Sequence, residues 1–354
     1  MNGQVLKYAL KKATTWNTAV ACGAANGVLL LPATVSRTAD VQIDDSLGSP
    51  YSLDGTPGAI KCDGELSGYL RYDSCDAILA GLMGTAGSAT VNTVNGYDHI
   101  YDYASSLDGI FFTLAKQMGS VYVRSVPSLK FLSLTIKGEA GQPLSFSAQV
   151  TGTNLVEDVT NDGTSFANVT FFETANRIAF AQGVFRLNAQ AGAALTSTTD
   201  DIKPSGFTLT ITRKLSGLYG SNTAGTTNKQ DVIDEPQNDG QTTFRLALTF
   251  PRHTAKTYLT ALIADTRYKF DATFTGATIP SGPARKFLIQ CPNLQLLTVN
   301  PADSQGNITE PLEFALHGVT TAPTGMTTPA GTTVGVTRPV RLFLTNRLNA
   351  DPLA

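Results

Sequence analysis

The chain has 354 residues, a length that favours two domains over one. Charged residues make up only 15% of it, against 42% hydrophobic residues, and it contains 32 Gly and 17 Pro. That composition is typical of a folded protein built from short strands and turns. A formal net charge of −2 argues against a protein that grips nucleic acid through its phosphates. No apolar run is long enough to span a membrane, and the N-terminus lacks the apolar core of a signal peptide; we therefore expect synthesis in the cytoplasm and no membrane partner.

The side chains that usually carry chemistry show no catalytic or metal-binding pattern. No two cysteines have C-x-x-C spacing, and the histidines have no metal-ligand spacing. The acidic pairs at 44–45 and 200–201 fit turns, because a glycosidase needs two carboxylates that face each other across a cleft. No phosphate-binding loop or nucleophile elbow is present. We expect no enzyme, no metal and no cofactor, and we expect the four cysteines to be mostly buried free thiols: Cys22, Cys62, Cys75 and Cys291.

Most of the chain alternates apolar and polar residues with a period of two, which predicts strands buried on one face. The segments 129–137 and 144–150 are predicted to form a hairpin. Helical spacing appears only in two short segments that each follow a strand, 74–83 and 254–263. Asp73 or Ser74 can cap the first of them. Helices this short are not stable alone, so each must lie on a sheet. Further alternating strands are predicted at 207–212, 244–250 and 340–344.

Three short segments recur in the same order in the two halves of the chain. Residues 27–32 resemble 183–188, residues 70–83 parallel 250–263, and residues 142–148 parallel 310–316. The pattern indicates a duplicated domain, and the alternative is chance similarity among β-rich segments. We divide the chain into a first domain with an N-terminal arm (1–165), a second domain (166–319), and a linker with a C-terminal strand (320–354). That strand either adds to the core or reaches a neighbouring subunit.

Each half carries a long insert with apolar residues among Gly and Pro, at 46–58 and 216–241. Long loops without secondary structure are usually functional or disordered. The apolar content favours loops that become ordered against a partner, and the alternative is plain disorder. The candidate contact residues are Leu47, Tyr51, Leu53, Pro57, Leu218, Tyr219, Val232 and Ile233.

The order of these segments resembles the tail tube proteins of long-tailed, siphovirus-like bacteriophages. The resemblance begins with Lys11-Lys12-Ala13-Thr14-Thr15-Trp16 and continues through Asp40-Val41-Gln42-Ile43 and the loop with Thr56-Pro57-Gly58. It then follows Gly64-Glu65-Leu66-Ser67-Gly68-Tyr69 into the first short helix. It covers residues 5–155, and the second half matches more loosely. The chain departs from simpler members of the family by carrying two tube-like domains.

The resemblance implies a mainly β fold in which each domain is a β-sandwich or tube fold with one short flanking helix. The sheets of neighbouring domains would join into a β-barrel around a channel, which removes exposed sheet edges. Family rings are typically six domains round, so three chains would close one ring. Rings would stack through the long loops into the virion tail tube. The implied partners are further copies of the chain, the tape measure protein and other tail proteins, and genomic DNA that passes without specific binding.

A channel that lets DNA slide should have a neutral or acidic wall. The candidate wall acids are Asp63 and Glu65, which share a face at period two, and Glu313 in the second half. The alternative for each is an ordinary solvated acid on the outside. The alternative function is another β-rich phage assembly protein, namely a capsid decoration, tail terminator or baseplate component.

Overall fold

The structure is a computed structural model of the whole chain. It describes residues 6–45, 50–52, 54–85, 90–93, 95–119, 122–157, 160–161, 166–171, 176–219, 232–253, 255–304, 307–327 and 334–354.

The described part of the chain is mainly β, as the sequence predicts, and its strands have the following bounds. They are β1 (Leu6–Lys12), β2 (Gly27–Val28), β3 (Ser36–Ile43), β4 (Gly55–Tyr69), β5 (Thr90–Thr93), β6 (Gly96–Asp102), β7 (Phe112–Met118), β8 (Tyr122–Glu139), β9 (Ser145–Gly152), β10 (Val156–Glu157), β11 (Gly183–Ala189), β12 (Asp201–Ile202), β13 (Gly206–Thr212), β14 (Leu215–Tyr219), β15 (Val232–Asn238), β16 (Thr243–Phe250), β17 (Arg267–Thr278), β18 (Ala284–Val299), β19 (Ala302–Ser304), β20 (Asn307–Leu316) and β21 (Arg341–Asn346). The helical elements are α1 (Asp76–Met83), the 3-10 turn η2 (Phe180–Gln182) and α3 (Thr257–Ile263).

The strands of each half are hydrogen-bonded in the same order. In the first half, antiparallel pairings give β2-β1-β7-β8-β9-β4-β3. In the second half they give β12-β11-β17-β18-β20-β16-β13. Among the described residues, each half has one α-helix that directly follows a strand of this order, α1 after β4 and α3 after β16. The hairpin predicted over 129–150 is confirmed as β8 and β9.

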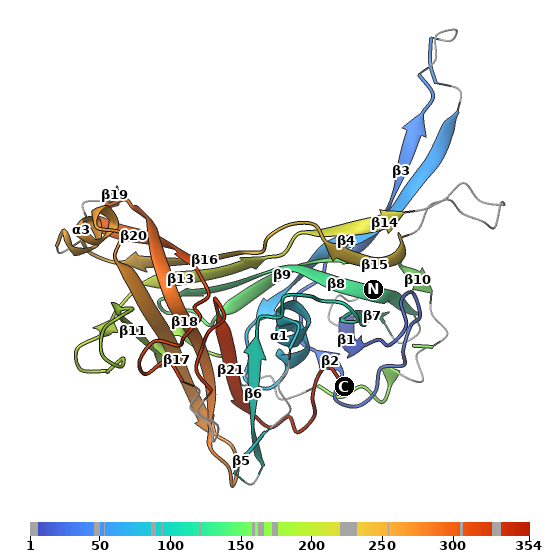
Figure 1. Cartoon of the computed structure of the whole chain (residues 1–354). Coiled ribbons are helices and arrows are strands. Elements are labelled where there is room, and N and C mark those ends of the chain that lie inside the picture. The colour runs from blue at the N-terminus through green and yellow to red at the C-terminus, as the bar shows by residue number, and fades with distance from the viewer. Residues whose placement is uncertain are drawn as a thin grey trace.

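One ladder joins the sheets of the two halves. The last part of β8 pairs with β13 from Glu139↔Gly206 to Ser133↔Thr212. The resulting sheet, which we call the joined sheet, has the order β4-β9-β8-β13-β16-β20. Figure 1 shows its strands crossing the top of the body, with α1 and the strands β1, β6, β7, β17, β18 and β21 beneath them, while the β3–β4 hairpin projects away from the body.

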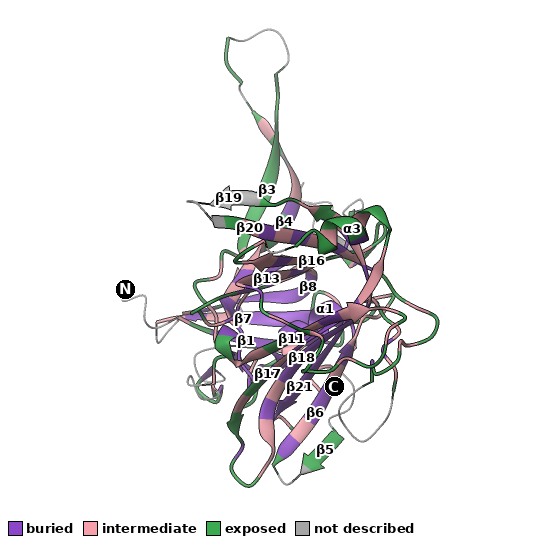
Figure 2. Cartoon of the chain, turned by 90° about the vertical axis from the view of Figure 1, so that its left-hand side faces the viewer, coloured by how far each residue is buried: buried purple, intermediate pink, exposed green. Residues whose placement is uncertain are grey.

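The hydrophobic core fills the space beneath the joined sheet and is shared by both halves. Its principal cluster contains Ile136 and Phe146 from the first half together with Leu209 and Phe314 from the second. Figure 2 shows buried residues gathered in this interior, whereas β3 is exposed along its length. All four cysteines are buried, and burial raises the pKa of the Cys62 and Cys75 thiols to about 12, so both are protonated and poorly nucleophilic at neutral pH.

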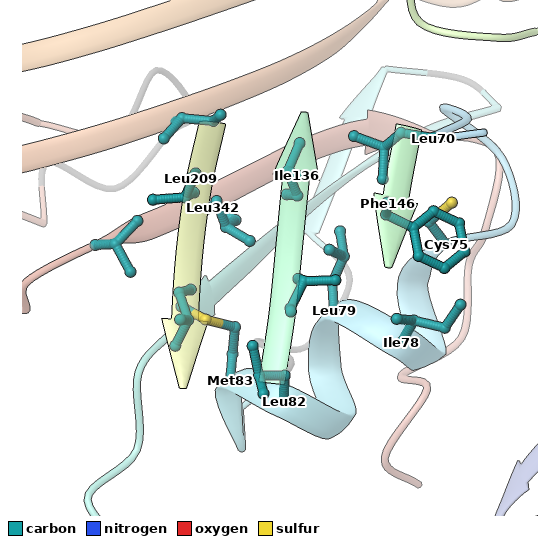
Figure 3. Packing of buried hydrophobic residues seen from close by; sticks show 14 of the residues in the cluster. Leu70, Cys75, Ile78, Leu79, Leu82, Met83, Ile136, Phe146, Leu209 and Leu342 are labelled. Carbon is teal, nitrogen blue, oxygen red and sulfur yellow. The ribbon is translucent and has the colours of Figure 1, made fainter. Parts of the chain in front are cut away.

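The two helices differ in how far they are covered. In α1 the residues Ile78, Leu79, Leu82 and Met83 are buried against the joined sheet and β21 (Figure 3). In α3 only Ala261 is buried, and Ile263 is 81% exposed. The prediction that each helix must be covered by a sheet is therefore met fully only by α1 in this single chain.

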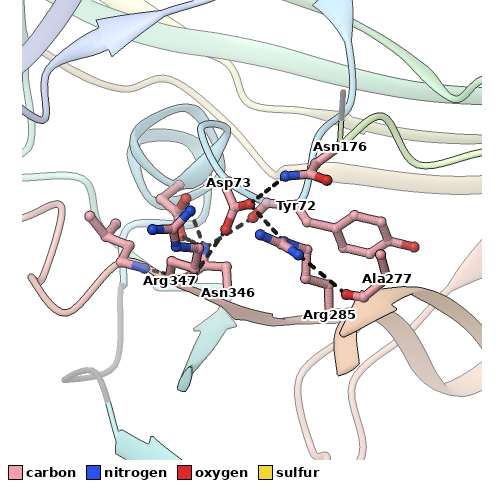
Figure 4. Close-up of polar contacts among 9 residues, drawn as sticks. Tyr72, Asp73, Asn176, Ala277, Arg285, Asn346 and Arg347 are labelled. Atoms are coloured by element: carbon pink, nitrogen blue, oxygen red, sulfur yellow. Dashed lines mark hydrogen bonds and ion pairs between the residues drawn. The ribbon is translucent and has the colours of Figure 1, made fainter. Parts of the chain in front are cut away.

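The predicted cap of α1 is wrong, because the residue at the N-cap is Cys75 and makes no side-chain capping bond. Asp73 instead binds Arg285 of β18 through a 2.7 Å ion pair in which both side chains are under 5% exposed. Asp73 also accepts hydrogen bonds from the Asn176 side chain and the Arg347 backbone N–H (Figure 4). Asp73 therefore belongs to a buried network of polar contacts, which we call the buried lock, between the two halves, and it does not cap the helix.

The C-terminal strand adds to the core of its own chain. β21 is buried along its whole length and pairs with β18 on one edge and with β6 on the other. Arg341 of β21 makes two 2.7 Å hydrogen bonds to the carboxylate of Asp102 at the end of β6. A charged bidentate pair of this kind fixes strand register as well as adding attraction.

We predict that Arg285→Met destabilises the chain by about 3–5 kcal/mol, because it leaves the Asp73 carboxylate buried without its guanidinium. Urea unfolding followed by circular dichroism measures the loss. The control is Lys203→Met, since Lys203 is 87% exposed and lies 3.5 Å from Asp201, where an ion pair contributes little. Equal losses in the two variants would contradict the buried lock.

Candidate assembly surfaces

One face of the joined sheet packs on the core and the opposite face is polar. Cross-strand partners point to the same side of a sheet, so each row of partners identifies one face. The core face carries the row Gly68, Phe146, Ile136, Leu209, Leu246 and Phe314. The other face, which we call the polar face, carries the rows Glu65, Gln149, Ser133, Thr212 and Thr243; Ser67, Ser147, Thr135, Thr210, Arg245 and Ala315; and Tyr69, Ser145, Lys137, Thr208, Ala247 and Glu313.

The structure brings the three predicted wall acids to this one polar face. Glu65 accepts hydrogen bonds from the Ser147 hydroxyl at 2.8 Å and the Gln149 amide at 3.2 Å. Asp63, two residues earlier on β4, accepts a 2.6 Å bond from the Thr151 hydroxyl. Glu313 lies on β20, 3.7 Å from Arg245 of β16. Acids from both halves thus share one continuous surface, although they are far apart in sequence.

The cations of these rows are paired with acids. Lys137 lies 2.7 Å from Glu139, with both side chains more than half exposed, and Arg245 faces Glu313. Asp63 and Glu65 are held by neutral hydroxyl and amide donors instead. The rows of the polar face therefore present neutral Thr and Ser side chains, two cations paired with acids, and carboxylates on Asp63 and Glu65 that are held by neutral donors. At its margin, the exposed Lys61 continues the alternation of β4, and Arg177 lies 4.6 Å from the Tyr69 ring. Such a surface offers little to hold phosphate groups.

The described residues of the two predicted inserts belong to two hairpins. The first insert connects β3 to β4, with Pro57 inside β4. The second was predicted to lack secondary structure, and this is wrong for its described part, because β14 and β15 pair from Leu215↔Asn238 to Tyr219↔Val232. The alternating pattern there is weak, since β15 contains Asp, Glu, Pro, Gln and Asn, so periodicity does not reveal it.

The predicted loop contacts lie on or beside these hairpins. Tyr51 is 69% exposed, and Leu218 and Tyr219 are 39% and 38% exposed. Leu47 and Leu53 lie outside the described residues, as do the side chains of Pro57, Val232 and Ile233. Apolar side chains that are exposed together at the end of a hairpin are candidates for contact with a partner.

A buried ion pair attaches the second hairpin to the joined sheet. Lys130 of β8 is 1% exposed and lies 2.5 Å from a carboxylate oxygen of Glu235 in β15. Lys130 also donates a 3.0 Å hydrogen bond to the backbone carbonyl of Pro236, and Glu235 accepts from the Gly109 backbone N–H. Burial lowers the pKa of Lys130, and Glu235 opposes that shift. Sequence reasoning missed this pair, because its members are more than 100 residues apart.

Sequence reasoning also missed Arg213, which follows β13 and closes the C-terminus of α1. Its guanidinium donates to the backbone carbonyls of Leu82, Met83 and Ala104 at 2.9–3.3 Å. It also lies 4.1 Å from the centre of the Tyr103 ring, a cation–π contact. Burial lowers the pKa of Arg213 to about 10. A residue of the second half thus provides hydrogen-bond donors for the free backbone carbonyls at the C-terminus of α1 in the first half.

The described residues contain no cluster of three or more His, Cys, Asp or Glu side chains that could hold a metal ion. Across the same residues, no helix is both long enough and apolar enough to cross a bilayer.

Comparison with known proteins gives the identity of the family. A search of curated proteins finds no match to the chain. The family model described as phage tail tube protein matches residues 3–316, a span that includes the whole joined sheet. The match confirms the family, the structural role and the virion location that the sequence resemblance implied. The chain therefore belongs to the phage tail tube protein family, and it is a structural, non-enzymatic protein that polymerises into the tube of the virion tail.

Proposed function

We propose that three copies of the chain close into a ring with pseudo-sixfold symmetry, and that each chain supplies two tandem tube domains, 1–165 and 166–319. The observation that carries this proposal is the identical strand order of the two halves, joined by the β8–β13 ladder. The first residues of the second domain, Phe166 and Val169, still pack on Ala9 and Ala115 of the first. Residues 320–354 form a linker and the C-terminal strand β21. Two like units in one chain take two like places in a ring.

The ring stoichiometry is tested by the mass of the smallest assembled species. We expect light scattering of a purified, non-elongating variant to give three times the mass of one chain. A cryo-electron microscopy map of the tube should then show three chains and six similar domains in each ring. A ring of six chains would contradict the proposal that the halves occupy equivalent places.

We propose that the polar face lines the channel and that DNA slides past it. Its neutral hydroxyls and its carboxylates on Asp63 and Glu65 support this role, since a wall rich in Lys and Arg would hold DNA by counterion release. Glu313 would contribute to the same wall next to Arg245. The tape measure protein would occupy the same bore before DNA does.

We predict that Glu65→Lys together with Glu313→Lys leaves tubes assembled but slows DNA ejection, and that added salt partly restores the rate, because each new cation adds a screened phosphate contact. Ejection into buffer is followed by fluorescence of a DNA-binding dye outside the particles. The matched control is Glu65→Gln together with Glu313→Gln, which removes charge without adding a cation. A rate equal to that of the control would remove the polar face from the channel wall.

We propose that rings stack through the tips of the two hairpins. Exposed Tyr51, Leu218 and Tyr219 support this contact, and the remaining candidates are Leu47, Leu53, Pro57, Val232 and Ile233. Removing the whole segment 216–241 is a poor test of stacking, because it also removes Glu235 and leaves Lys130 buried without its partner. Point substitutions at the exposed described residues of the hairpins avoid this problem.

We predict that Leu218→Ser with Tyr219→Ser gives folded rings that no longer elongate, because apolar area between rings is lost. Negative-stain microscopy measures tube length, and circular dichroism checks the fold. The control is Val184→Ser, a residue that is 44% exposed on β11, away from both hairpins. Tubes of normal length from the double variant would refute the stacking contact.

A further inference from the structure

The two halves of the chain join where β13 pairs with β8 above α1. Each half also has a second, matching surface that this contact does not use. Within the chain, β13 lies on the free edge of β8, and α1 is buried beneath that junction. Because the two halves have the same strand order, each half should offer the same two surfaces: a strand edge with its helix, like β8 with α1, and an outer strand that can pair with such an edge, like β13. One surface of each half is used inside the chain, and no further strand pairs with the other in the described structure.

The first open surface is the edge of β18 beyond Gln295. Phe146 of β9 pairs with Ile136 of β8, and Phe314 of β20 pairs with Leu296 of β18, so Leu296 holds the place of Ile136. Ile136 pairs with Leu209 on its other edge. The pairing of β18 with β17 begins at Arg267↔Gln295, so in the described structure no strand lies on that edge at Leu296.

The helix beside this edge is open in the same way. α1 is covered by the second half, with Arg213 bound to its last carbonyls. α3 occupies the matching place beside β18, but Leu259 is 42% and Ile263 is 81% exposed. The neighbouring turn is closed by the chain itself, through the Thr266 N–H to the Ala261 carbonyl. An apolar face that is buried in one half and bare in the other indicates a missing neighbour.

The second open surface is the segment 29–35 that precedes β3. In the second half, Leu209 of β13 pairs with Leu246 of β16, which in turn pairs with Phe314. In the first half, Gly68 of β4 pairs with Phe146, and segment 29–35 runs beside Gly68, with the Leu31 N–H bonded to the Ser67 carbonyl at 2.8 Å. This segment thus holds the place of β13. Leu31 is 45% exposed.

We propose that segment 29–35 of one chain docks on the free edge of β18 and on Leu259 and Ile263 of α3 in the next chain, repeating between chains the joint that β13 makes with β8 and α1 inside one chain. The joint is head-to-tail, so it forms a closed ring when the rotation between successive chains adds up to a full turn. The occupant is a second copy because the same chain carries both surfaces and an internal example of their fit. Pro32 lacks a backbone N–H, and the Ala33 N–H already donates to the Tyr8 hydroxyl at 2.9 Å, so this edge can form few backbone hydrogen bonds and apolar contact by Leu31 carries much of the joint.

Photo-crosslinking in assembled tubes tests the joint, which rests on the proposed ring. The photoreactive residue p-benzoylphenylalanine replaces Ile263, whose exposure makes the exchange harmless to the fold. Probe-bearing chains are mixed with ¹⁵N-labelled wild-type chains, irradiated and digested with trypsin. We expect crosslinks to the ¹⁵N-labelled peptide 13–37, which contains segment 29–35. A probe at Val184, exposed on β11, serves as the matched control and should not label that peptide.

The outcomes separate the joint from the ring. Crosslinks from position 263 to other peptides, or only within one chain, overturn the joint while leaving a trimeric ring intact. Crosslinks to peptide 13–37 in a ring of six chains support the joint and refute the trimer. As an independent measure, Ile263→Asp and Leu31→Asp should each give a monomer mass by light scattering with an unchanged unfolding midpoint, whereas Val184→Asp should still form rings. Rings from either of the first two variants would also overturn the joint.

Discussion

The ladder between β8 and β13 is the interaction on which the rest of the structure depends. It makes one sheet of two, so the space beneath it becomes one core to which both halves contribute Ile136, Phe146, Leu209 and Phe314. Without it, the edges of β8 and β13 would present unpaired backbone groups, and the buried face of α1 would lose part of its cover. Burial of α1 and continuity of the polar face both follow from this one pairing.

Buried charges then fix how the halves meet. Arg285 with Asp73, Arg213 with the end of α1, and Lys130 with Glu235 each connect segments more than 100 residues apart. A hydrophobic core tolerates small slips, whereas a buried charge that loses its partner is strongly destabilising. These contacts therefore select one register and one relative placement of the halves. A subunit of a tube needs this rigidity, since a small error in each subunit accumulates along the polymer.

The two faces of the joined sheet differ in chemistry. The core face carries large apolar side chains, while the polar face carries Thr, Ser and acids whose neighbours are mostly neutral. The exposed apolar side chains discussed above are on other segments: Leu31, Tyr51, Val184, α3 and the hairpin β14–β15. This division supports the proposal that the polar face lines the channel and that the exposed apolar side chains contact other copies of the chain.

Much of this architecture is determined by the sequence itself. Alternation over 129–137, 207–212 and 244–250 predicts amphipathic strands because side chains of a strand point to alternate faces, and the structure confirms them as parts of β8, β13 and β16. Helical spacing likewise predicts α1 and α3, and period two places Asp63 and Glu65 on one face. Local pattern is sufficient for these features because each depends only on neighbours along the chain.

Other features were decided only by the tertiary structure. The cap of α1, the pairing of β14 with β15, and the meeting of Glu65 with the face that carries Glu313 depend on partners distant in sequence. No periodicity within one segment encodes which strand will lie beside it, so neither the β8–β13 ladder nor its bare counterpart on β18 could be found from the sequence. The sequence determined which faces are apolar, and only folding decided which of them remain uncovered, because burial is a property of the whole packed chain.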